Sequence, residues 1–377
     1  MYLCFPFLFS GNHFSLRKNY IHIILYPISL IYGLVTAFRN WLFDIELLKS
    51  TGFSIPTITV GNLSVGGAGK TPHTEFILSS LQEEYKMAVL SRGYKRNTKG
   101  FRLANEKSDN RIIGDESFQI FQKFPAITVA VDEKRVHGVQ KLLELIPDLQ
   151  VIVLDDAFQH RRIRSGFSIL VTDFSNLYCN DRMLPDGRLR EWKSSSKRAN
   201  CIIVSKCPTD LKPIDMRLVE TELKPETNQS LFFSSYEYDE LIPLFPQAKP
   251  ENWTYDRLKG DNAGVLLVAG IVSPQPIVDY LKKFTDNIES LFFPDHHAFN
   301  PKDFNLISKK FNSLTALEKI LLVTEKDAAR LLLNPLFPES LKPLTFALPI
   351  KVKILNNQDD SFIQKIKNYV AENSRNR

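Results

Sequence analysis

A glycine-rich loop ending in lysine and threonine is the part of this chain best suited to chemistry. Residues 61–72 read GNLSVGGAGKTP, between a β-rich run and a helical pattern. Glycines let backbone N–H groups turn inward around a polyphosphate, while Lys70 would reach the outer phosphates and the Thr71 hydroxyl would bind Mg²⁺. The predicted nucleotide-contacting residues are Ser64, Val65, Gly66, Gly67, Ala68, Gly69, Lys70 and Thr71. The alternative is a glycine-rich turn with a surface lysine, because Ser64 stands where the strict motif G-x-x-x-x-G-K-[ST] has glycine.

Two adjacent carboxylates follow the apolar run Val151–Leu154, some ninety residues after the loop. A hydrophobic strand ending in Asp155 and Asp156 has the form of the strand whose acid holds Mg²⁺ in phosphate-loop enzymes. The predicted metal ligands are therefore Thr71, Asp155 and Asp156. The alternative is an aspartate that caps the following helix.

Asp132 is the first choice for a general base. It follows a predicted strand and precedes Glu133, Lys134 and Arg135. If the reaction moves a phosphoryl group onto an alcohol, a positioned carboxylate must accept or orient the hydroxyl proton. The alternative is a helix N-cap within a solvated, charged face.

Cationic loops follow several predicted strands and suit a phosphorylated substrate, because guanidinium groups bind phosphate through two hydrogen bonds. Such runs more often form solvated faces, which is the competing interpretation. The predicted substrate contacts are Arg92, Gln159, His160, Arg161 and Arg190.

The string Pro294–His297 places an aspartate before two histidines in the second half of the chain. It is open to three interpretations: a metal site, a histidine that reaches across a cleft to tune a base, or partly buried histidines bonded to their neighbours. The rest of a metal-dependent phosphoesterase's ligand set is not recognisable.

Short apolar runs alternate with helical patterns from residue 55 onward, which is typical of a parallel α/β sheet. The predicted strands are Ile55–Val60, Met87–Leu90, Ala126–Val131, Val151–Leu154, Ile169–Thr172, Cys201–Val204, Val265–Ala269 and Ile320–Thr324. The predicted helices are Pro72–Tyr85, Ser117–Lys123, Lys134–Leu145, Pro276–Phe284 and one from Lys326. Because open α/β sheets bind ligands at the carboxyl ends of their strands, the candidate acids fall at one edge.

We therefore expect an α/β fold with a P-loop NTPase-like core, a mostly parallel sheet, a smaller C-terminal α/β lobe and an N-terminal hydrophobic helix. The expected boundaries are 1–50 for a membrane-associating segment, 51–210 for the core, and 211–377 for a connector and the smaller lobe.

The run Ile21–Phe38 is almost uncharged and apolar, near the lower length limit for spanning a bilayer. Arg17 and Lys18 precede it and Arg39 follows it. It is compatible with a spanning helix, a helix lying in the interface or a buried core helix. A membrane-facing segment is the favoured interpretation.

The composition is that of an ordinary globular protein, with 44% hydrophobic and 24% charged residues in 377. The net charge of +6 fits an anionic partner without naming one. The four cysteines form no C-x-x-C pair, which favours a reduced, cytosolic chain. Neither a nucleic-acid partner nor an obligate protein partner is inferred, and no guanine-reading motif supports GTP.

Separated strings along the chain resemble the tetraacyldisaccharide 4'-kinases of lipid A biosynthesis, in that family's order. Ser64 in the loop is similar to the family's own variant. The strings are Val60–Pro72, Leu90–Tyr94, Gly114–Glu116, Asp132–Gly138, Leu154–Arg162, Leu184–Glu191, Ala269–Ile271, Pro294–His296 and Val323–Asp327.

The resemblance implies ATP- and Mg²⁺-dependent phosphorylation of a 4'-hydroxyl on an acylated disaccharide 1-phosphate. It implies Lys70 at ATP, Asp132 as general base, and His296 as the histidine paired with that base. It also implies an N-terminal helix on the cytoplasmic face of the inner membrane, where a lipid substrate lies. The competing classes are a membrane-associated P-loop ATPase switch without a small-molecule acceptor, and a non-catalytic membrane scaffold.

Overall fold

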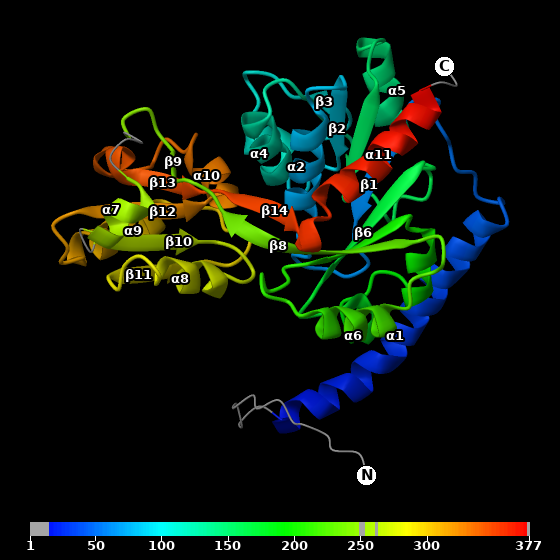
Figure 1. Ribbon diagram of the computed structural model, residues 1–377, viewed down its shortest axis with the longest axis horizontal. Helices are drawn as coiled ribbons and strands as arrows, with labels where there is room; N and C mark the ends of the chain where they lie inside the picture. Colours follow the sequence, from blue (N-terminus) through cyan, green and yellow to red (C-terminus); the bar gives the residue numbers. More distant parts are fainter. Residues whose placement is uncertain (1–14, 249–252, 261–262, 375–377) are drawn as a thin grey trace.

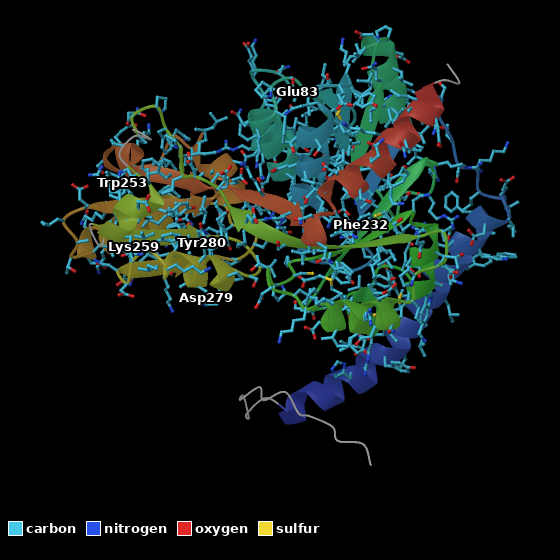
Figure 2. The ribbon with its side chains drawn as sticks, viewed as in Figure 1. Glu83, Phe232, Trp253, Lys259, Asp279 and Tyr280 are labelled. Carbon is cyan, nitrogen blue, oxygen red and sulfur yellow. The ribbon has the colours of Figure 1, made fainter. Side chains whose placement is uncertain are left out.

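The computed structural model describes residues 15–248, 253–260 and 263–374, which form two lobes, each built around one sheet (Figure 1). Side chains fill the space between sheet and helices in both lobes: Phe232 lies in the first lobe, and Trp253 and Tyr280 lie in the second (Figure 2). A long N-terminal helix, α1 (Ser15–Asp44), lies along the outside of the first lobe.

The first lobe contains a nine-stranded sheet in the order β14-β8-β7-β6-β1-β5-β2-β4-β3 across the described residues. All neighbours pair in parallel except the two edge strands, β14 and β3. The strands are β1 (Thr57–Gly61), β2 (Met87–Ser91), β3 (Arg102–Leu103), β4 (Thr128–Val131), β5 (Val151–Asp155), β6 (Phe167–Asp173), β7 (Cys201–Ser205), β8 (Ser230–Tyr238) and β14 (Ile350–Ile354). Strands β1, β2, β5 and β7 are buried throughout, as expected of parallel strands covered on both faces.

Helices cover both faces of this sheet. One apolar core lies under α2, α4 and α11, and others lie under α5 and under α6 with the loops beside it. The helices of this lobe are α2 (Lys70–Leu81), α3 (Asn110–Ile113), α4 (Asp115–Lys123), α5 (Arg135–Leu145), α6 (Pro213–Leu223), α11 (Asp359–Ser374) and the short 3₁₀ turns Tyr178–Asn180, Lys193–Arg198 and Leu355–Asn357.

The second lobe is a five-stranded sheet in the order β11-β10-β12-β13-β9 among the described residues, parallel except for β9. Its strands are β9 (Ile242–Pro243), β10 (Gly264–Ala269), β11 (Ile288–Phe292), β12 (Lys319–Thr324) and β13 (Thr345–Leu348). Its helices are α7 (Tyr255–Gly260), α8 (Gln275–Leu281), α9 (Pro301–Ser313), α10 (Glu325–Leu331) and the 3₁₀ turn Glu339–Leu344. Apolar side chains of α9 and α10 cover one face, and those of α7 and α8 cover the other.

The α/β class, the parallel sheet and the smaller lobe agree with the sequence analysis, and every predicted strand lies within a few residues of an observed one. The expected division at residue 210 differs from the sheet pairing. Strand β8 pairs with β7, β14 pairs with β8, and Phe362 of α11 packs in the first core. The chain therefore enters the second lobe after β8 and returns to the first lobe at β14. Local sequence patterns do not predict this return.

Helix α1 turns small and polar residues toward the protein and apolar residues outward. Ser29, Gly33 and Thr36 are buried, whereas Ile31 and Leu34 are 63% and 67% exposed. This exposure excludes the core-helix interpretation of the apolar run. In the part of the chain that the structure describes, no helix is long and apolar enough to cross a membrane. Residues 1–14 of the predicted membrane-associating segment lie outside the described residues.

Candidate active site

A cavity of about 1640 Å³ opens at the carboxyl ends of the parallel strands, between the two lobes. Its walls come from α1, the glycine-rich loop, the ends of β2 and β5, and the facing surface of the second lobe. This is where an open α/β sheet is expected to bind ligands. The predicted site residues that line the cavity are Val65, Gly66, Gly67, Gly69, Lys70, Thr71, Arg92, Asp155, Asp156, Gln159, His160, Arg190 and His296.

The glycine-rich loop joins the end of β1 to the first turn of α2. Gly66 and Gly69 have φ values of 109° and 84°, which other residues rarely adopt. A Cβ at Gly69 would also collide with the hydroxyl of Tyr236. Two predicted contacts do not line the cavity: Ser64 forms a bridge with Leu189, and the backbone oxygen of Ala68 accepts a hydrogen bond from Ser205 at 2.8 Å.

The first turn of α2 presents free backbone N–H groups toward the loop, since no side chain caps it. His73 fixes this turn: its Nδ1 lies 2.7 Å from the Gly69 oxygen and its Nε2 lies 2.8 Å from the Ser234 hydroxyl. Burial lowers the pKa of His73 to about 4, so the ring is neutral near pH 7. An uncapped helix N-terminus beside Lys70 is a site for phosphate oxygens.

The two acids after β5 differ in environment. Asp155 is buried and accepts a hydrogen bond from Thr74 at 3.0 Å, and burial together with the charges of Asp156 and Glu116 raises its pKa to about 6. Asp156 has a side chain 38% exposed, 3.7 Å from Lys70. Burial acts to raise its pKa, but the positive charges of Lys70 and two arginines outweigh burial and lower it. Asp156 is therefore the more acidic and the more exposed of the two carboxylates that line the cavity.

Four of the five predicted substrate contacts lie in the cavity wall. Arg190 contacts Asp156 at 3.4 Å and Gln159 at 3.3 Å. Burial, and next the charge of Arg135, lower the pKa of His160 to about 4. Arg161, the fifth, does not line the cavity: its guanidinium donates to Asp44 and to the Asn40 oxygen of α1, each at 2.7 Å. Arg161 therefore anchors the end of α1, whereas its neighbours Gln159 and His160 line the cavity.

Asp132 does not line the cavity and does not contact His296. One of its oxygens accepts from the Lys134 N–H at 2.8 Å, and the other lies 2.6 Å from His137 Nδ1. The carboxylate stabilises the turn that starts α5, which was the alternative interpretation. In this structure the predicted pairing of Asp132 with His296 is therefore wrong.

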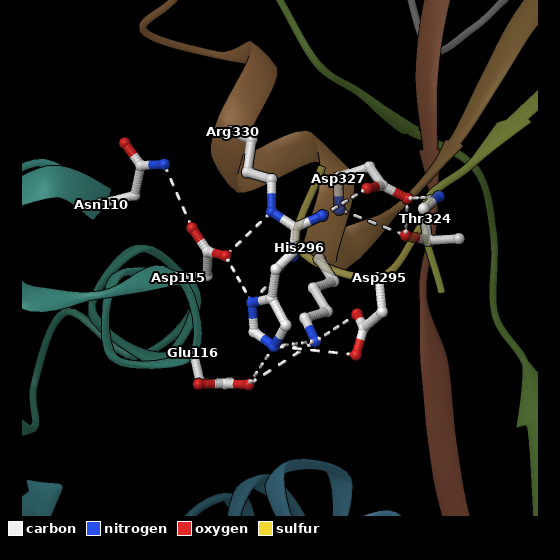
Figure 3. A network of polar contacts seen from close by, with 10 residues as sticks. Asn110, Asp115, Glu116, Asp295, His296, Thr324, Asp327 and Arg330 are labelled. Carbon is white, nitrogen blue, oxygen red and sulfur yellow. Dashed lines mark hydrogen bonds and ion pairs between the residues drawn. The ribbon is translucent and has the colours of Figure 1, made fainter. Parts of the chain in front are cut away.

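His296 pairs instead with Asp115, at the start of α4 (Figure 3). Its Nδ1 lies 3.0 Å from Asp115 Oδ2, and its Nε2 lies 3.1 Å from Lys326 Nζ. Since a carboxylate accepts and an ammonium donates, this geometry assigns the ring proton to Nδ1 and a lone pair to Nε2. His296 lines the cavity, and a carboxylate from the opposite lobe orients its ring.

Asp115 carries a full set of partners. Its Oδ1 accepts from Asn110 at 3.1 Å, and its Oδ2 also accepts from Arg330 Nε at 2.9 Å. Burial acts to raise the pKa of Asp115, but the hydrogen bond from His296 and the charge of Arg330 outweigh it and hold the pKa well below its usual range. Asp115 is therefore an anion that orients His296.

Three cavity residues have left-handed backbone conformations although none is glycine. The φ values are 46° for Asp156, 58° for Lys206 and 61° for His296. Such conformations cost energy outside glycine and concentrate at functional sites, where surrounding contacts hold them.

Sequence reasoning missed Asp115, Glu116, Lys326 and Arg330 as site residues. The string containing Asp115 and Glu116 supported the family resemblance, yet acids in a first helical turn are common for electrostatic reasons alone. Lys326 and Arg330 follow β12, whose sequence superficially resembled a guanine-reading motif. Their role becomes visible only when α10 is placed against α4.

Helix α1 is joined to the glycine-rich loop through the segment 182–192. The Val65 N–H donates to the Arg188 oxygen at 2.7 Å, and the Arg190 N–H donates to the Leu63 oxygen at 2.8 Å. The Trp192 indole donates to the Gly33 oxygen at 2.7 Å. A Cβ at Gly33 would lie 2.6 Å from that indole, so the helix needs glycine at this contact.

The donor set of the cavity fits a magnesium nucleotide. Thr71, Asp155 and Asp156 offer hard oxygen atoms, which Mg²⁺ prefers, and Mg²⁺ normally completes its shell with water and phosphate oxygens. Lys70, the uncapped helix end and the two positive-φ glycines fit the phosphates. Among the described residues no group of three or more His, Cys, Asp or Glu side chains is placed to hold a metal ion.

Comparison with known proteins gives a consistent result. A profile of the family described as Tetraacyldisaccharide-1-P 4'-kinase matches residues 21–371. The chain is 49% identical over 361 residues to a tetraacyldisaccharide 4'-kinase of Bacteroides thetaiotaomicron, covering 94% of this chain and 95% of that one. It is 43% identical to the same-named protein of Flavobacterium johnsoniae, covering 94% and 99% of the two chains.

A solved structure is also similar. The crystal structure of LpxK from Aquifex aeolicus in complex with ATP superposes with a TM-score of 0.71 at 28% identity, covering 93% of this chain and 99% of that chain.

Proposed function

The chain belongs to the tetraacyldisaccharide 4'-kinase family, and we propose that it transfers the γ-phosphoryl group of ATP to the 4'-hydroxyl of a tetraacyldisaccharide 1-phosphate in lipid A biosynthesis. The observation that carries the proposal is that His296, which Asp115 orients, lines the same cleft as the phosphate-binding loop. A phosphate-binding loop alone also occurs in switches and motors. A base facing it from the other lobe is what an alcohol acceptor requires.

The nucleotide is assigned to the glycine-rich loop, with Lys70 at the outer phosphates and Thr71, Asp155 and Asp156 toward Mg²⁺. When bound, the metal neutralises charge that develops on the phosphate oxygens. Lys70 and Arg190, both beside Asp156, supply positive charge fixed in place before the reaction.

The acceptor proton is assigned to His296 Nε2. Asp115 bonds to the ring at Nδ1, so the carboxylate orients the ring and stabilises it after protonation. The bond from the 4'-oxygen to the γ-phosphorus forms as the bond to the β–γ bridging oxygen breaks. The displaced electron pair stays on ADP, and the hydroxyl proton passes to His296.

We assign substrate binding to the part of the cleft between α1 and the cationic wall. Tyr32, Thr36 and Arg39 of α1 line this part, opposite Arg190 and His160. These cations suit the phosphate already present on the substrate. The outward apolar face of α1 suits the lipid phase that holds its acyl chains, and it supports our proposal that the enzyme works at the membrane surface, on the cytoplasmic face of the inner membrane.

The acceptor assay tests the function. ADP release is measured with ATP and Mg²⁺, with and without the acylated disaccharide 1-phosphate in mixed micelles. We expect release to require the lipid, with phosphate appearing at the 4'-position. Rapid ADP release that is independent of acceptor would contradict the kinase and favour an ATPase switch.

The membrane assignment predicts the effect of charge on the outer face of α1. Ile31→Glu with Leu34→Glu removes two exposed apolar side chains, each worth about 1.5–3 kcal/mol when buried, so co-sedimentation with anionic vesicles should fall at least tenfold. Leu317→Glu, at an exposed apolar position of the second lobe, serves as the control. Unchanged sedimentation of the α1 variant would refute this membrane face.

A further inference from the structure

Arg330 connects the catalytic pair to the framework of the second lobe (Figure 3). Its side chain is only 5% exposed, and its Nε donates to Asp115 Oδ2 at 2.9 Å. Its Nη1 donates to Asp327 Oδ1 at 2.9 Å, and its Nη2 lies 3.4 Å from His296 Nδ1. One guanidinium group thus contacts the carboxylate, the histidine and a buried anchor.

The anchor, Asp327, is built into the second lobe. Its side chain is fully buried and accepts from the Gly270 N–H at 2.8 Å and from the Thr324 hydroxyl at 2.6 Å. Strand β10 ends just before Gly270 and β12 ends at Thr324, so Asp327 fixes the guanidinium against two strand ends. This explains the string Thr324–Asp327: Asp327 binds Arg330 and does not recognise a nucleotide base.

Asp115 belongs to the first lobe, whereas His296 and Arg330 belong to the second. The lobes meet here through α4 and α10, with Ala329 packed against Ile113 and Phe118. Asp327 fixes the guanidinium of Arg330 through Nη1. The Nε atom therefore has a defined position, in contact with Asp115 of the first lobe. The Asp115 carboxylate therefore contacts two side chains of the second lobe, Arg330 and the His296 that it orients.

We propose that Arg330 is a positioning residue that assembles the base across the two lobes, fixing Asp115 so that it orients His296. It touches neither nucleotide nor acceptor in this assignment, and it acts through Asp115. The inference rests on the proposed function of the Asp115–His296 pair. It adds Arg330, whose loss misaligns the pair and removes a positive charge beside it while the phosphate-binding loop stays intact.

The charge environment gives the sign of the pH effect. The charged and titratable groups that face the pair are Glu116 on α4, Asp295 beside His296, Lys326 and Arg330 on α10, and Tyr94, whose ring meets the His296 ring edge-on. The guanidinium is a cation beside the pair and opposes its protonation. Removing it lets the pair keep a proton to higher pH, so the acid limb of the kcat/KM profile should move upward in pH.

The test uses the full-length enzyme with lipid acceptor, and compares Arg330→Gln with Arg330→Lys. We expect Arg330→Gln to lower kcat about 10²-fold, because misplacement near 1 Å costs about that much, with the KM for ATP little changed. Its acid limb should move to higher pH. Arg330→Lys keeps the charge without the two-pronged geometry, so it should recover part of kcat and leave the acid limb in place.

Arg96→Gln is the matched control, since Arg96 is also buried and pairs with Glu133 at 2.5 Å without lining the cleft. Melting temperatures of all variants separate loss of fold from loss of positioning. If Arg330 acts through Asp115, then Arg330→Gln in an Asp115→Asn background should cause no further loss of kcat.

Two results would overturn the inference. Arg330→Gln with wild-type kcat and an unmoved acid limb would show that Asp115 is positioned without it, as would full additivity with Asp115→Asn. Wild-type turnover by Asp115→Asn alone would instead place the failure in the proposed pair, and the role of Arg330 would be refuted together with it.

Discussion

Asp115→Asn is expected to lower kcat about 10²- to 10⁴-fold, within the range for loss of general-base catalysis. Asparagine keeps the size of the side chain but removes the charge that orients His296 and stabilises its protonated ring. ATP affinity should change little, because Asp115 lies on α4 in contact with His296 and Arg330, away from the phosphate-binding loop. Single-turnover kinetics with saturating ATP measures the chemical step directly.

Two companion variants sharpen this result. His296→Ala should cause a loss of similar size, and the double variant should be less than additive because the two residues form one unit. Asp132→Asn should keep most turnover, since that carboxylate contacts Lys134 and His137 beside α5. The reverse pattern, with Asp132→Asn inactive and Asp115→Asn active, would restore the assignment made from sequence.

Lys70→Ala should have an effect of comparable size, lowering kcat about 10²- to 10³-fold, as the loss of a preorganised charge at a transferring group does. The ammonium lies at the start of α2, 3.7 Å from Asp156, the carboxylate assigned to the metal. ATP affinity should also fall, because the interaction exists before the transition state. Isothermal titration with a non-hydrolysable nucleotide, together with the acceptor assay, measures the two effects separately.

The control for Lys70 is Lys86→Ala, an exposed lysine paired with Asp148 on the surface of the first lobe. It should leave turnover and nucleotide affinity unchanged. Retained vesicle binding by Lys70→Ala, with its lipid phosphorylation lost, would also exclude the scaffold alternative. A Lys70→Ala protein with near-normal turnover would show that the loop does not hold the reacting phosphates.

Local sequence carries information about the nucleotide half of the site. Strand β1, the glycine-rich loop and α2 follow one another in the chain. The positions of Lys70 and Thr71 therefore depend only on a short segment after β1. Asp155 and Asp156 were predicted for the same reason, because they follow a buried strand directly. The need of α1 for an apolar environment was also predictable, since a long apolar run with few charges must find either a core or a lipid surface.

Helix α1 shows the limit of such a pattern. Its apolar run did not distinguish between interface, span and core, because side-chain composition is similar in all three. Burial of Ser29, Gly33 and Thr36 against the protein, with Ile31 and Leu34 outward, narrowed the choice. Arg161 was misassigned for a related reason: a cation next to site residues in sequence can turn toward α1 in space.

The sequence by itself predicted the phosphate-binding loop, the two acids after β5 and the family, because each rests on short local strings of residues. Only the tertiary structure brought together the pair that we propose as the base. Asp115 and His296 are separated by 181 positions, and their hydrogen bond exists because two lobes with separate cores meet along α4 and α10. No local pattern distinguishes Asp115 from Asp132, since Asp115 begins a helix and Asp132 lies just before one. The difference lies in their contacts. Asp115 bonds to Arg330 and His296 of the second lobe, whereas Asp132 bonds within its own turn.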